Sequence, residues 1–526
     1  MLGKMTSRVI YLLLILSIVI ISHDLCSRTG DRQMRDTAFR QYDIRGIVGD
    51  ELIIEEIYDL VRAIAYYFVQ KNPACKTIAV GMDGRVDSAA IKQEMCRALS
   101  DSGMNVMFIG VCPSPVLYFA LHTLPVDGGL MITASHNPKE YNGIKICCGT
   151  ESVWGKEIQH IARLYKEKKH TIVKDNPSIH CSASNTHSRA EALAKAGGER
   201  GKGNIVDYPL IPAYVDWLAD HFQQLKNMDL AAVIDCGNGV AGTVMPQLIK
   251  KMGWQQVKLL YEDVDGTFPN HEADPVKEVN MRAVKQQLDT TDAYIGIGFD
   301  GDADRMGAMT KTGTLIPGDK LLGIFAHSIV QKNPGTPIVF NVICSSALVE
   351  LLEKWGAQPI ITAVGHSIIE EEMRKQGALL GGETSCHFFF KDRYFGYDDG
   401  IYAACRLFEI LLTSDKNLQE LLQMFPPKVT SPEYRIPCPE EKKQLIVDKV
   451  KQLFTAQPDI TTITIDGVRA TMNYGWGILR ASNTQPVLSL RFESDSLKGL
   501  QQVKHDFLVA LQDYFDVDAL RKQLEI

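Results

Sequence analysis

The feature that most constrains this fold is a pattern that occurs three times along the chain, in which a short apolar run ends in a polar loop. The runs alternate with longer amphipathic stretches, which is typical of βα units. The polar loops lie near Ser135, Asp302 and Ser385. Because α/β folds bind ligands in loops at the carboxyl ends of strands, we predict three similar α/β domains with mixed sheets that face one central cleft.

The chain has 526 residues, which is too long for one ordinary core. After Pro426 and Pro427 the pattern changes, and apolar runs followed by a helix from about Leu497 predict a smaller C-terminal α+β domain. A Ser-, Asn-, Lys- and Gly-rich stretch predicts a surface insertion near 174–204. We expect an apolar N-terminal segment over 1–36 and four domains over 37–207, 208–313, 314–428 and 429–526.

The formal net charge of −7 gives no global electrostatic reason to expect a nucleic-acid partner. Any site for phosphate must therefore be a local cluster of donors and cations. The twelve cysteines show neither a CxxC motif nor the Cys/His spacing of a metal site. We expect reduced thiols, which suit a protein body in the cytoplasm.

An apolar run over residues 9–22 has the length of a signal-peptide core and is short for the roughly 20 residues of a membrane span. Two basic residues precede it, three arginines follow it, and no small-residue cleavage site is present. Two interpretations stay open. The run is an uncleaved anchor that contacts the inner membrane, or the working start is Met34 and the run lies upstream of it.

The sequence TASHNP at 133–138 places a serine on a loop directly after an apolar strand. A serine on a sharply turned, accessible loop can act as a nucleophile or carry a phosphate. The alternative is a helix N-cap, because Ser or Asn before Pro often starts a helix.

The sequence DGDADR at 300–305 places three carboxylates at alternate positions, and in extended backbone they project to one side. A calcium loop of the EF-hand type is excluded, since Arg305 stands at its sixth position and Lys311 at its twelfth. Three aspartates with open positions suit magnesium completed by a phosphate oxygen. An acidic surface turn without metal is the alternative.

Two further loops carry polar side chains suited to a phosphorylated sugar. GGETSCH at 381–387 offers a carboxylate, a hydroxyl and an imidazole at alternate positions, which can bind neighbouring sugar hydroxyls. RASNTQP at 480–486 combines a guanidinium with Ser, Asn and Thr donors, which can hold a phosphate dianion. The alternative for the second loop is an ordinary turn stabilised by Asn or Thr.

Together, in this order and spacing, the four motifs resemble the α-D-phosphohexomutase superfamily, and the chain is most similar to its bacterial phosphomannomutase/phosphoglucomutase members. The resemblance extends from Phe39 to about Leu511 and includes YDIRG, PSPVLYFA, IDCGNGVAG and VDGTFPNHEADP. It implies an intramolecular phosphotransferase that interconverts hexose 6-phosphate and hexose 1-phosphate of mannose and/or glucose. The product would feed nucleotide-sugar and polysaccharide synthesis.

The resemblance also implies the roles of individual residues, the cofactor and the partners. Ser135 would carry the phosphate, with Asp300, Asp302, Asp304 and the phosphoserine as ligands of Mg²⁺. Hexose 1,6-bisphosphate would be both intermediate and activator, the partners would be small sugar phosphates, and the protein would be a monomer. The matching substrate-binding residues are Tyr42, His366, Glu383, Ser385, Arg480, Ser482, Asn483 and Thr484; the candidates for catalysis beside the serine are Arg45, His136, Lys145, Arg305 and His387.

Three positions depart from the family pattern: Ile343 replaces a lysine of close bacterial relatives, Cys386 replaces a glycine and Gln485 replaces a glutamate. Ile343 leaves the choice of sugar open, because mannose and glucose differ at one stereocentre. Three alternatives therefore remain: a phosphoglucosamine mutase of the same fold, a membrane-tethered sugar-phosphate-binding protein with poor catalysis, and a phosphatase-like activity.

Overall fold

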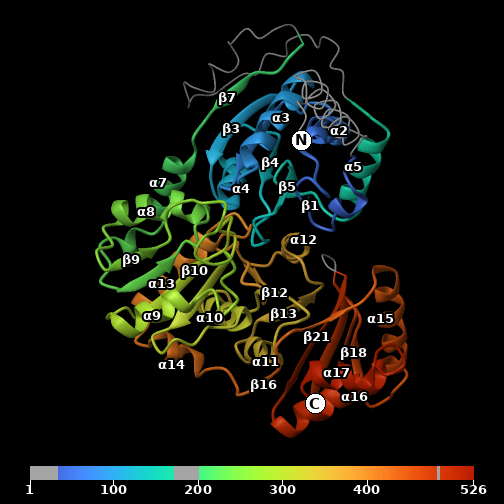
Figure 1. Ribbon diagram of the computed structural model, residues 1–526. Helices are drawn as coiled ribbons and strands as arrows, with labels where there is room; N and C mark the ends of the chain where they lie inside the picture. The colour runs from blue at the N-terminus through green and yellow to red at the C-terminus, as the bar shows by residue number, and fades with distance from the viewer. Residues whose placement is uncertain (1–32, 171–200, 483–485) are drawn as a thin grey trace, which may run out of the picture.

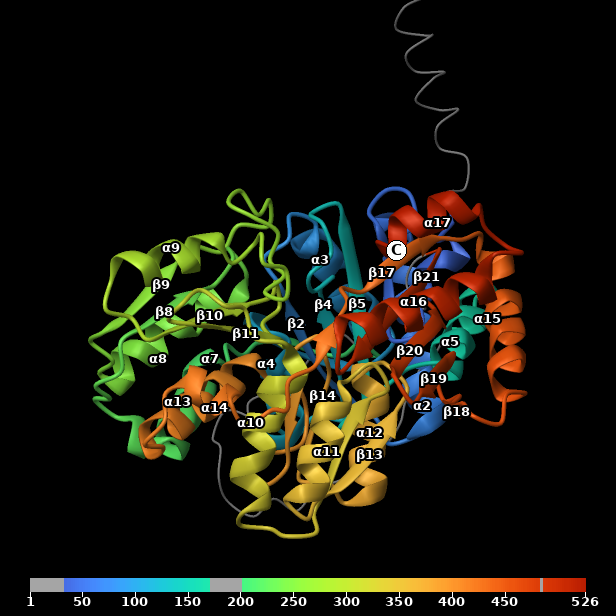
Figure 2. The ribbon, with the colours of Figure 1, turned by 90° about the horizontal axis from the view of Figure 1, so that it is seen from below.

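The computed structural model describes residues 33–170, 201–482 and 486–526. Four sheets, each with its own helices, follow one another along the chain (Figure 1). The first domain lies at the top of Figure 1, the second at the left, the third in the centre and the fourth at the lower right. Figure 2 shows the same four units from below.

The first sheet is mixed and follows the order β1-β5-β4-β2-β3-β7, with β6 beside β5. Strands β2, β3, β4 and β7 run parallel, whereas β5 runs antiparallel to β1 and β4. The antiparallel turn from β4 to β5 contains Ser135. The elements are η1 (Asp36–Ala38), β1 (Ile44–Ile47), η2 (Ile54–Glu56), α2 (Ile57–Lys71), β2 (Thr77–Met82), α3 (Ser88–Asp101), β3 (Asn105–Val111), α4 (Ser114–Thr123), β4 (Gly128–Ile132), β5 (Tyr141–Cys148), β6 (Glu151–Ser152), α5 (Lys156–Lys166) and β7 (Ile205–Asp207).

The second sheet has the order β11-β10-β8-β9, and only β11 is antiparallel to its neighbour in this described sheet. The turn from β10 to β11 contains the three aspartates. The elements are α7 (Ile211–His221), η3 (Gln223–Leu225), β8 (Ala232–Asp235), η4 (Val240–Thr243), α8 (Met245–Met252), β9 (Val257–Leu260), α9 (Arg282–Thr290), β10 (Ile295–Phe299) and β11 (Met306–Thr310).

The third sheet repeats this plan in the order β13-β12-β14-β15, and the antiparallel turn from β14 to β15 contains Glu383 and Ser385. Helix α13 (Gly400–Thr413) also packs on β10 and β11, so the second and third domains share one core. The other elements are α10 (Gly318–Val330), β12 (Pro337–Asn341), α11 (Ser346–Lys354), β13 (Gln358–Thr362), α12 (His366–Gln376), β14 (Leu380–Gly382), β15 (Phe388–Phe390) and α14 (Leu418–Leu422).

The fourth sheet has the order β16-β21-β20-β19-β18, and β17 also pairs with β21. All its pairings among described residues are antiparallel, and its helices give it a separate core. The elements are β16 (Val429–Thr430), β17 (Tyr434–Pro437), α15 (Glu440–Thr455), β18 (Thr461–Ile463), β19 (Val468–Met472), β20 (Gly475–Ala481), β21 (Val487–Ser494), α16 (Leu497–Leu511) and α17 (Val517–Leu524).

These sheets confirm the predicted fold class: three α/β domains with mixed sheets and a smaller C-terminal α+β domain. One predicted loop differs from expectation. GGETSCH at 381–387 was expected to be a loop throughout, but its two glycines belong to β14. A Cβ at Gly381 would lie 2.5 Å from Met373 Sδ, so the missing side chain lets helix α12 pack directly on this strand.

The apolar run 9–22 and most of the expected insertion near 174–204 lie outside the described residues. Within the described ranges, no helix is both long and apolar enough to cross a membrane. Met34 is buried in the first core, and its backbone N–H lies 3.4 Å from the hydroxyl of Tyr165. The ten cysteines in the described part of the chain have free thiols.

Candidate active site

Ser135 lies on a strained turn between β4 and β5. Its φ of +50° is in the left-handed region, which costs a residue with a side chain on the order of 1 kcal/mol. The backbone N–H donates to Thr133 Oγ1 at 2.9 Å. The Ser135 hydroxyl donates to Asp300 Oδ2 at 2.7 Å and lies 3.1 Å from His136 Nδ1. The strained turn thus aims the hydroxyl at the acidic loop of the second domain.

Arg85, for which the sequence predicts no role, holds this turn in place. Its buried guanidinium donates to four backbone carbonyls, those of Ser135 (2.7 Å), Asn137 (2.6 Å), Pro138 (2.8 Å) and Tyr141 (2.9 Å). Asp83 balances the charge, with Oδ2 3.1 Å from Arg85 Nε. The only signal in the sequence is the Asp-Gly-Arg directly after a buried strand.

We expect Arg85→Met to destabilise the first domain by about 3–5 kcal/mol, because the substitution leaves Asp83 buried without its counter-ion. Turnover should fall as well, since the Ser135 turn loses four hydrogen bonds. Denaturant unfolding followed by activity assays measures both effects. The double variant Asp83→Asn/Arg85→Met no longer buries an unpaired charge, so most of the lost stability should return while turnover stays low. If turnover recovered as fully as stability, Arg85 would not be a positioning residue.

The three aspartates of the second domain form a compact buried cluster. One carboxylate oxygen from each of Asp300, Asp302 and Asp304 lies within 4.8 Å of the others. The backbone is a turn, not the extended segment we expected, and Ala303 has a φ of +57°. A Cβ at Gly301 would lie 2.4 Å from the Ser135 carbonyl oxygen, so glycine is required where the two loops meet.

Cations from two domains offset the charge of this cluster. Lys145 Nζ lies 2.8 Å from Asp302 Oδ2 and 2.5 Å from Asp304 Oδ2, and Arg305 Nε donates to Asp300 Oδ2 at 3.1 Å. Burial and the two neighbouring carboxylates raise the pKa of Asp300 well above its ordinary value. Arg305 is itself buried, and its ion pair with Asp300 stabilises the acidic loop.

The acidic cluster fits a magnesium ion. Among the described residues, Oδ1 of Asp302 is buried and has no hydrogen-bond partner, and Oδ1 of Asp304 has none apart from its ion pair with His387 Nε2 at 3.3 Å. A buried carboxylate oxygen without a donor is costly, and a hard divalent cation is the ligand that such oxygens prefer. The Ser135 hydroxyl reaches the same cluster through Asp300, so a phosphate on this serine could complete the coordination.

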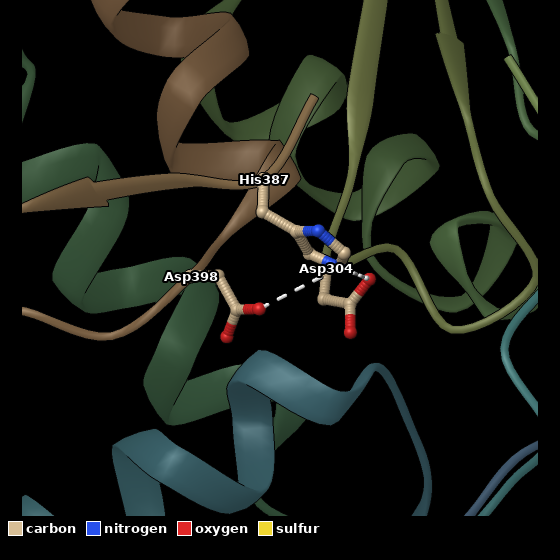
Figure 3. Close-up of side chains that lie close together, drawn as sticks. All are labelled: Asp304, His387 and Asp398. Atoms are coloured by element: carbon tan, nitrogen blue, oxygen red, sulfur yellow. Dashed lines mark ion pairs between the residues drawn. The ribbon is translucent and has the colours of Figure 1, made fainter. Parts of the chain in front are cut away.

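His387 lies among three carboxylates, two of which, Asp304 and Asp398, are drawn with it in Figure 3. Its Nε2 is 3.3 Å from Asp304 Oδ1 and 3.8 Å from Asp398 Oδ2, and its Nδ1 is 3.2 Å from Glu383 Oε2. Burial acts to lower the pKa of His387, but these carboxylates raise it to about 9. Asp398 had no predicted role; it comes from the YDDG segment that precedes α13.

Hydrogen bonds of Glu383 and Ser385 fix the loop after β14. Glu383 Oε1 accepts from the Gly365 N–H at 2.8 Å and from Asn341 Nδ2 at 3.1 Å. Burial acts to raise the pKa of Glu383, but hydrogen bonds and the charge of His387 lower it to about 2. Ser385 Oγ lies 3.1 Å from His387 Nδ1. Both side chains face the cavity described next.

Most of the predicted site residues line one cleft of about 240 Å³. Its wall includes Arg45, whose Nη1 donates to Asn137 Oδ1 at 2.7 Å, and Tyr42, whose hydroxyl donates to the Val364 carbonyl. Tyr42 and His366 pack with ring centroids 5.7 Å apart. The predicted site residues that line the cleft are Tyr42, Arg45, Ser135, His136, Lys145, Asp304, His366, Glu383, Ser385 and His387.

The predicted phosphate loop lines an adjoining pocket of about 190 Å³, together with Ile343. Arg480 donates from Nε (3.0 Å) and Nη2 (2.8 Å) to Asp466 Oδ2. Asp466 Oδ2 also accepts the Val364 N–H at 3.1 Å, so this unpredicted carboxylate ties the fourth domain to the third. Ser482 lies in the same wall, whereas Asn483 and Thr484 lie outside the described residues.

Models of all four phosphoglucomutase/phosphomannomutase domain families match the chain. The alpha/beta/alpha domains I, II and III match residues 36–171, 212–313 and 317–429, and the C-terminal domain matches residues 433–510. These matches follow the order of the four sheets.

Two curated relatives are similar over most of their length. A phosphomannomutase/phosphoglucomutase of Pseudomonas aeruginosa is 38% identical over 470 residues, which cover 89% of this chain and 94% of the relative. A phosphoglucomutase of Neisseria meningitidis is 37% identical over 475 residues, with coverage of 90% and 96%.

Solved structures of phosphohexomutases are similar to this chain in fold. A phosphoglucomutase/phosphomannomutase family protein of Burkholderia thailandensis has a TM-score of 0.78 and 32% identity, covering 91% of this chain and 98% of its own. An Aspergillus fumigatus N-acetylphosphoglucosamine mutase, solved with GlcNAc-6P and magnesium, shares the fold at 15% identity and a TM-score of 0.57, with coverage of 92% and 96%.

Proposed function

The chain belongs to the phosphoglucomutase/phosphomannomutase family, and from this premise we propose that it interconverts the 6- and 1-phosphates of mannose and/or glucose through a phosphorylated Ser135. The observation that carries the proposal is the 2.7 Å hydrogen bond from the Ser135 hydroxyl to Asp300, which joins a serine of one domain to the acidic cluster of the next. Relatives that are 37–38% identical are named as phosphomannomutase/phosphoglucomutase or phosphoglucomutase, so the glucosamine alternative is not favoured.

In the proposed reaction the bond between phosphorus and Ser135 Oγ breaks while a bond forms to the free hydroxyl oxygen of the sugar phosphate. A bound Mg²⁺ would offset the negative charge of the group in transit. The hydroxyl proton passes to a side chain in the cleft, for which His136 beside Ser135 is the candidate; Arg45, Lys145 and His387, positively charged beside carboxylates, would offset the charge of the transferring group. The resulting hexose 1,6-bisphosphate then returns its other phosphate to Ser135.

Both ends of the substrate must react at one serine, so the sugar must bind in two orientations. In the proposal Glu383 and Ser385, which line the cleft, bind ring hydroxyls, and Arg480 with Ser482, which line the adjoining pocket, holds the phosphate that does not react. The two adjoining cavities separate these tasks. Holding the distal phosphate positions the reacting end and keeps water from the phosphoserine.

The test is an assay of the full chain with mannose 1-phosphate, glucose 1-phosphate and glucosamine 6-phosphate, in the presence of Mg²⁺ and glucose 1,6-bisphosphate. We expect turnover of the first, the second or both. Absence of turnover with every substrate would contradict the enzyme proposal, and turnover of glucosamine 6-phosphate alone would favour the alternative. Net release of inorganic phosphate would indicate the phosphatase-like activity.

We expect Arg480→Ala to raise the KM for glucose 1-phosphate by about 10- to 100-fold, the cost of losing a charge-assisted phosphate contact, and to change kcat less. Steady-state kinetics measures the two constants separately. Arg374→Ala, on the exposed face of α12, is a matched control that should leave both unchanged. A fall in kcat with an unchanged KM would contradict the distal-phosphate role.

A further inference from the structure

The fourth domain presents a second arginine beside Arg480. In the register of the sheet, Arg435 of β17 pairs with Ser489 of β21, which pairs with Arg480 of β20. Cross-strand partners project to the same face of a sheet. The two arginines therefore stand in one row, with backbones two strand spacings or roughly 10 Å apart.

Arg435 lines both the catalytic cleft and the adjoining pocket. Tyr42, Val364 and Ser385 also line both, so the two cavities meet where these residues lie. Among the described residues around the catalytic cleft, Arg435 is the one that the fourth domain supplies. It therefore places a cation at the junction through which a substrate spanning both cavities must pass.

The pairing of β17 with β21 fixes the backbone of Arg435, and its side chain is more than half exposed. Arg435 Nη2 lies 3.6 Å from Glu433 Oε2, and the Arg435 side chain is 57% exposed. Glu433 in turn accepts a hydrogen bond from Ser489 Oγ. An ion pair this exposed contributes little to stability, so a phosphate dianion can compete with Glu433 for the guanidinium.

Ile343 lines the smaller pocket without contributing a charge. Its side chain is 6% exposed and packs with Val342, Trp476 and Ile478 between the third and fourth domains. The lysine that the family resemblance leads one to expect here is therefore absent from the wall. The cations among the described residues of that pocket are Arg435 and Arg480.

We propose that Arg435 binds the phosphorylated substrate at the junction of the two cavities, supplies the charge that Ile343 lacks, and retains hexose 1,6-bisphosphate while it turns. This proposal rests on the mutase function proposed above. A guanidinium can bind two phosphate oxygens at once, and from the junction it can reach the intermediate in either orientation. Without it, the intermediate escapes more often, and the enzyme needs more added bisphosphate to recover its phosphoserine.

The experiment compares Arg435→Ala and Arg435→Lys with Arg521→Ala, a matched control on the exposed face of α17. The readouts are the KM for glucose 1-phosphate and the glucose 1,6-bisphosphate concentration that gives half-maximal activity. We expect Arg435→Ala to raise both by about 10-fold, Arg435→Lys to raise them less, and Arg521→Ala to change neither. Unchanged values in Arg435→Ala would overturn the proposal.

Two further measurements separate this proposal from the proposed function. Calorimetric binding of glucose 1-phosphate in the Ser135→Ala background needs no turnover, and adding Arg435→Ala should weaken it about 10-fold; an unchanged affinity would refute the contact even if the protein proves inactive. Adding Ile343→Lys to Arg435→Ala should lower the raised bisphosphate requirement, because the lysine returns a cation to the same pocket. A requirement that stays raised would contradict the charge-replacement role of Arg435.

Discussion

Ser135→Ala is expected to lower kcat by on the order of 10³-fold or more, because no other group at this position can carry the phosphoryl group between the two ends of the sugar. The substitution removes only the hydroxyl that donates to Asp300 and lies beside His136. Its backbone contacts to Thr133 and Arg85 do not involve the side chain, so the turn should persist.

Intact-protein mass spectrometry gives a second readout that does not depend on turnover. After incubation with glucose 1,6-bisphosphate and Mg²⁺, the unaltered protein should gain the mass of one phosphate, and Ser135→Ala should not. Ser328→Ala, on helix α10, is the control: its hydroxyl bonds only within the helix in the described structure, so rate and mass gain should be unchanged. A mass gain retained in Ser135→Ala would assign the phosphate to another residue.

The parts of this site that the sequence could predict are those carried by local pattern. An apolar strand followed by a polar loop places Ser135, the aspartates and Glu383 at carboxyl ends of strands, and the structure has them there. The sequence also predicted that the three aspartates cluster, but it predicted this from an extended backbone that projects alternate side chains to one side. In the structure a turn with Ala303 in the left-handed region brings the carboxylates together.

The residues that the sequence did not predict act through contacts between distant segments. Arg85 reaches carbonyls about 50 positions along the chain, and Asp466 binds the N–H of Val364, 102 positions away. Asp398 lies beside His387 because the segment before α13 pairs with β15 through a bridge between Phe389 and Asp398. Such contacts depend on strand register and on how the domains dock, which hydrophobic periodicity alone does not determine.

Removal of divalent cations is the second large expected effect. Treatment with EDTA should lower turnover by on the order of 10²- to 10³-fold, because the phosphoryl group would then approach a buried cluster of negative charge. Lys145 offsets part of that charge, but its ammonium group already contacts Asp302 and Asp304. Adding Mg²⁺ back should restore the rate.

The same site predicts a change in stability that is independent of activity. Mg²⁺ that binds only the folded protein stabilises it by about 2.7 kcal/mol at a concentration 100 times its Kd, so the Tm should rise with added Mg²⁺. Asp302→Asn should lose most of this rise, since it removes one of the three carboxylate charges that would hold the ion. Asp216→Asn, which breaks a surface pair with Lys251, should keep it. If the EDTA-treated protein retained full activity and its Tm did not respond to Mg²⁺, the aspartates would be a structural cluster held by Lys145 and Arg305 and not a metal site.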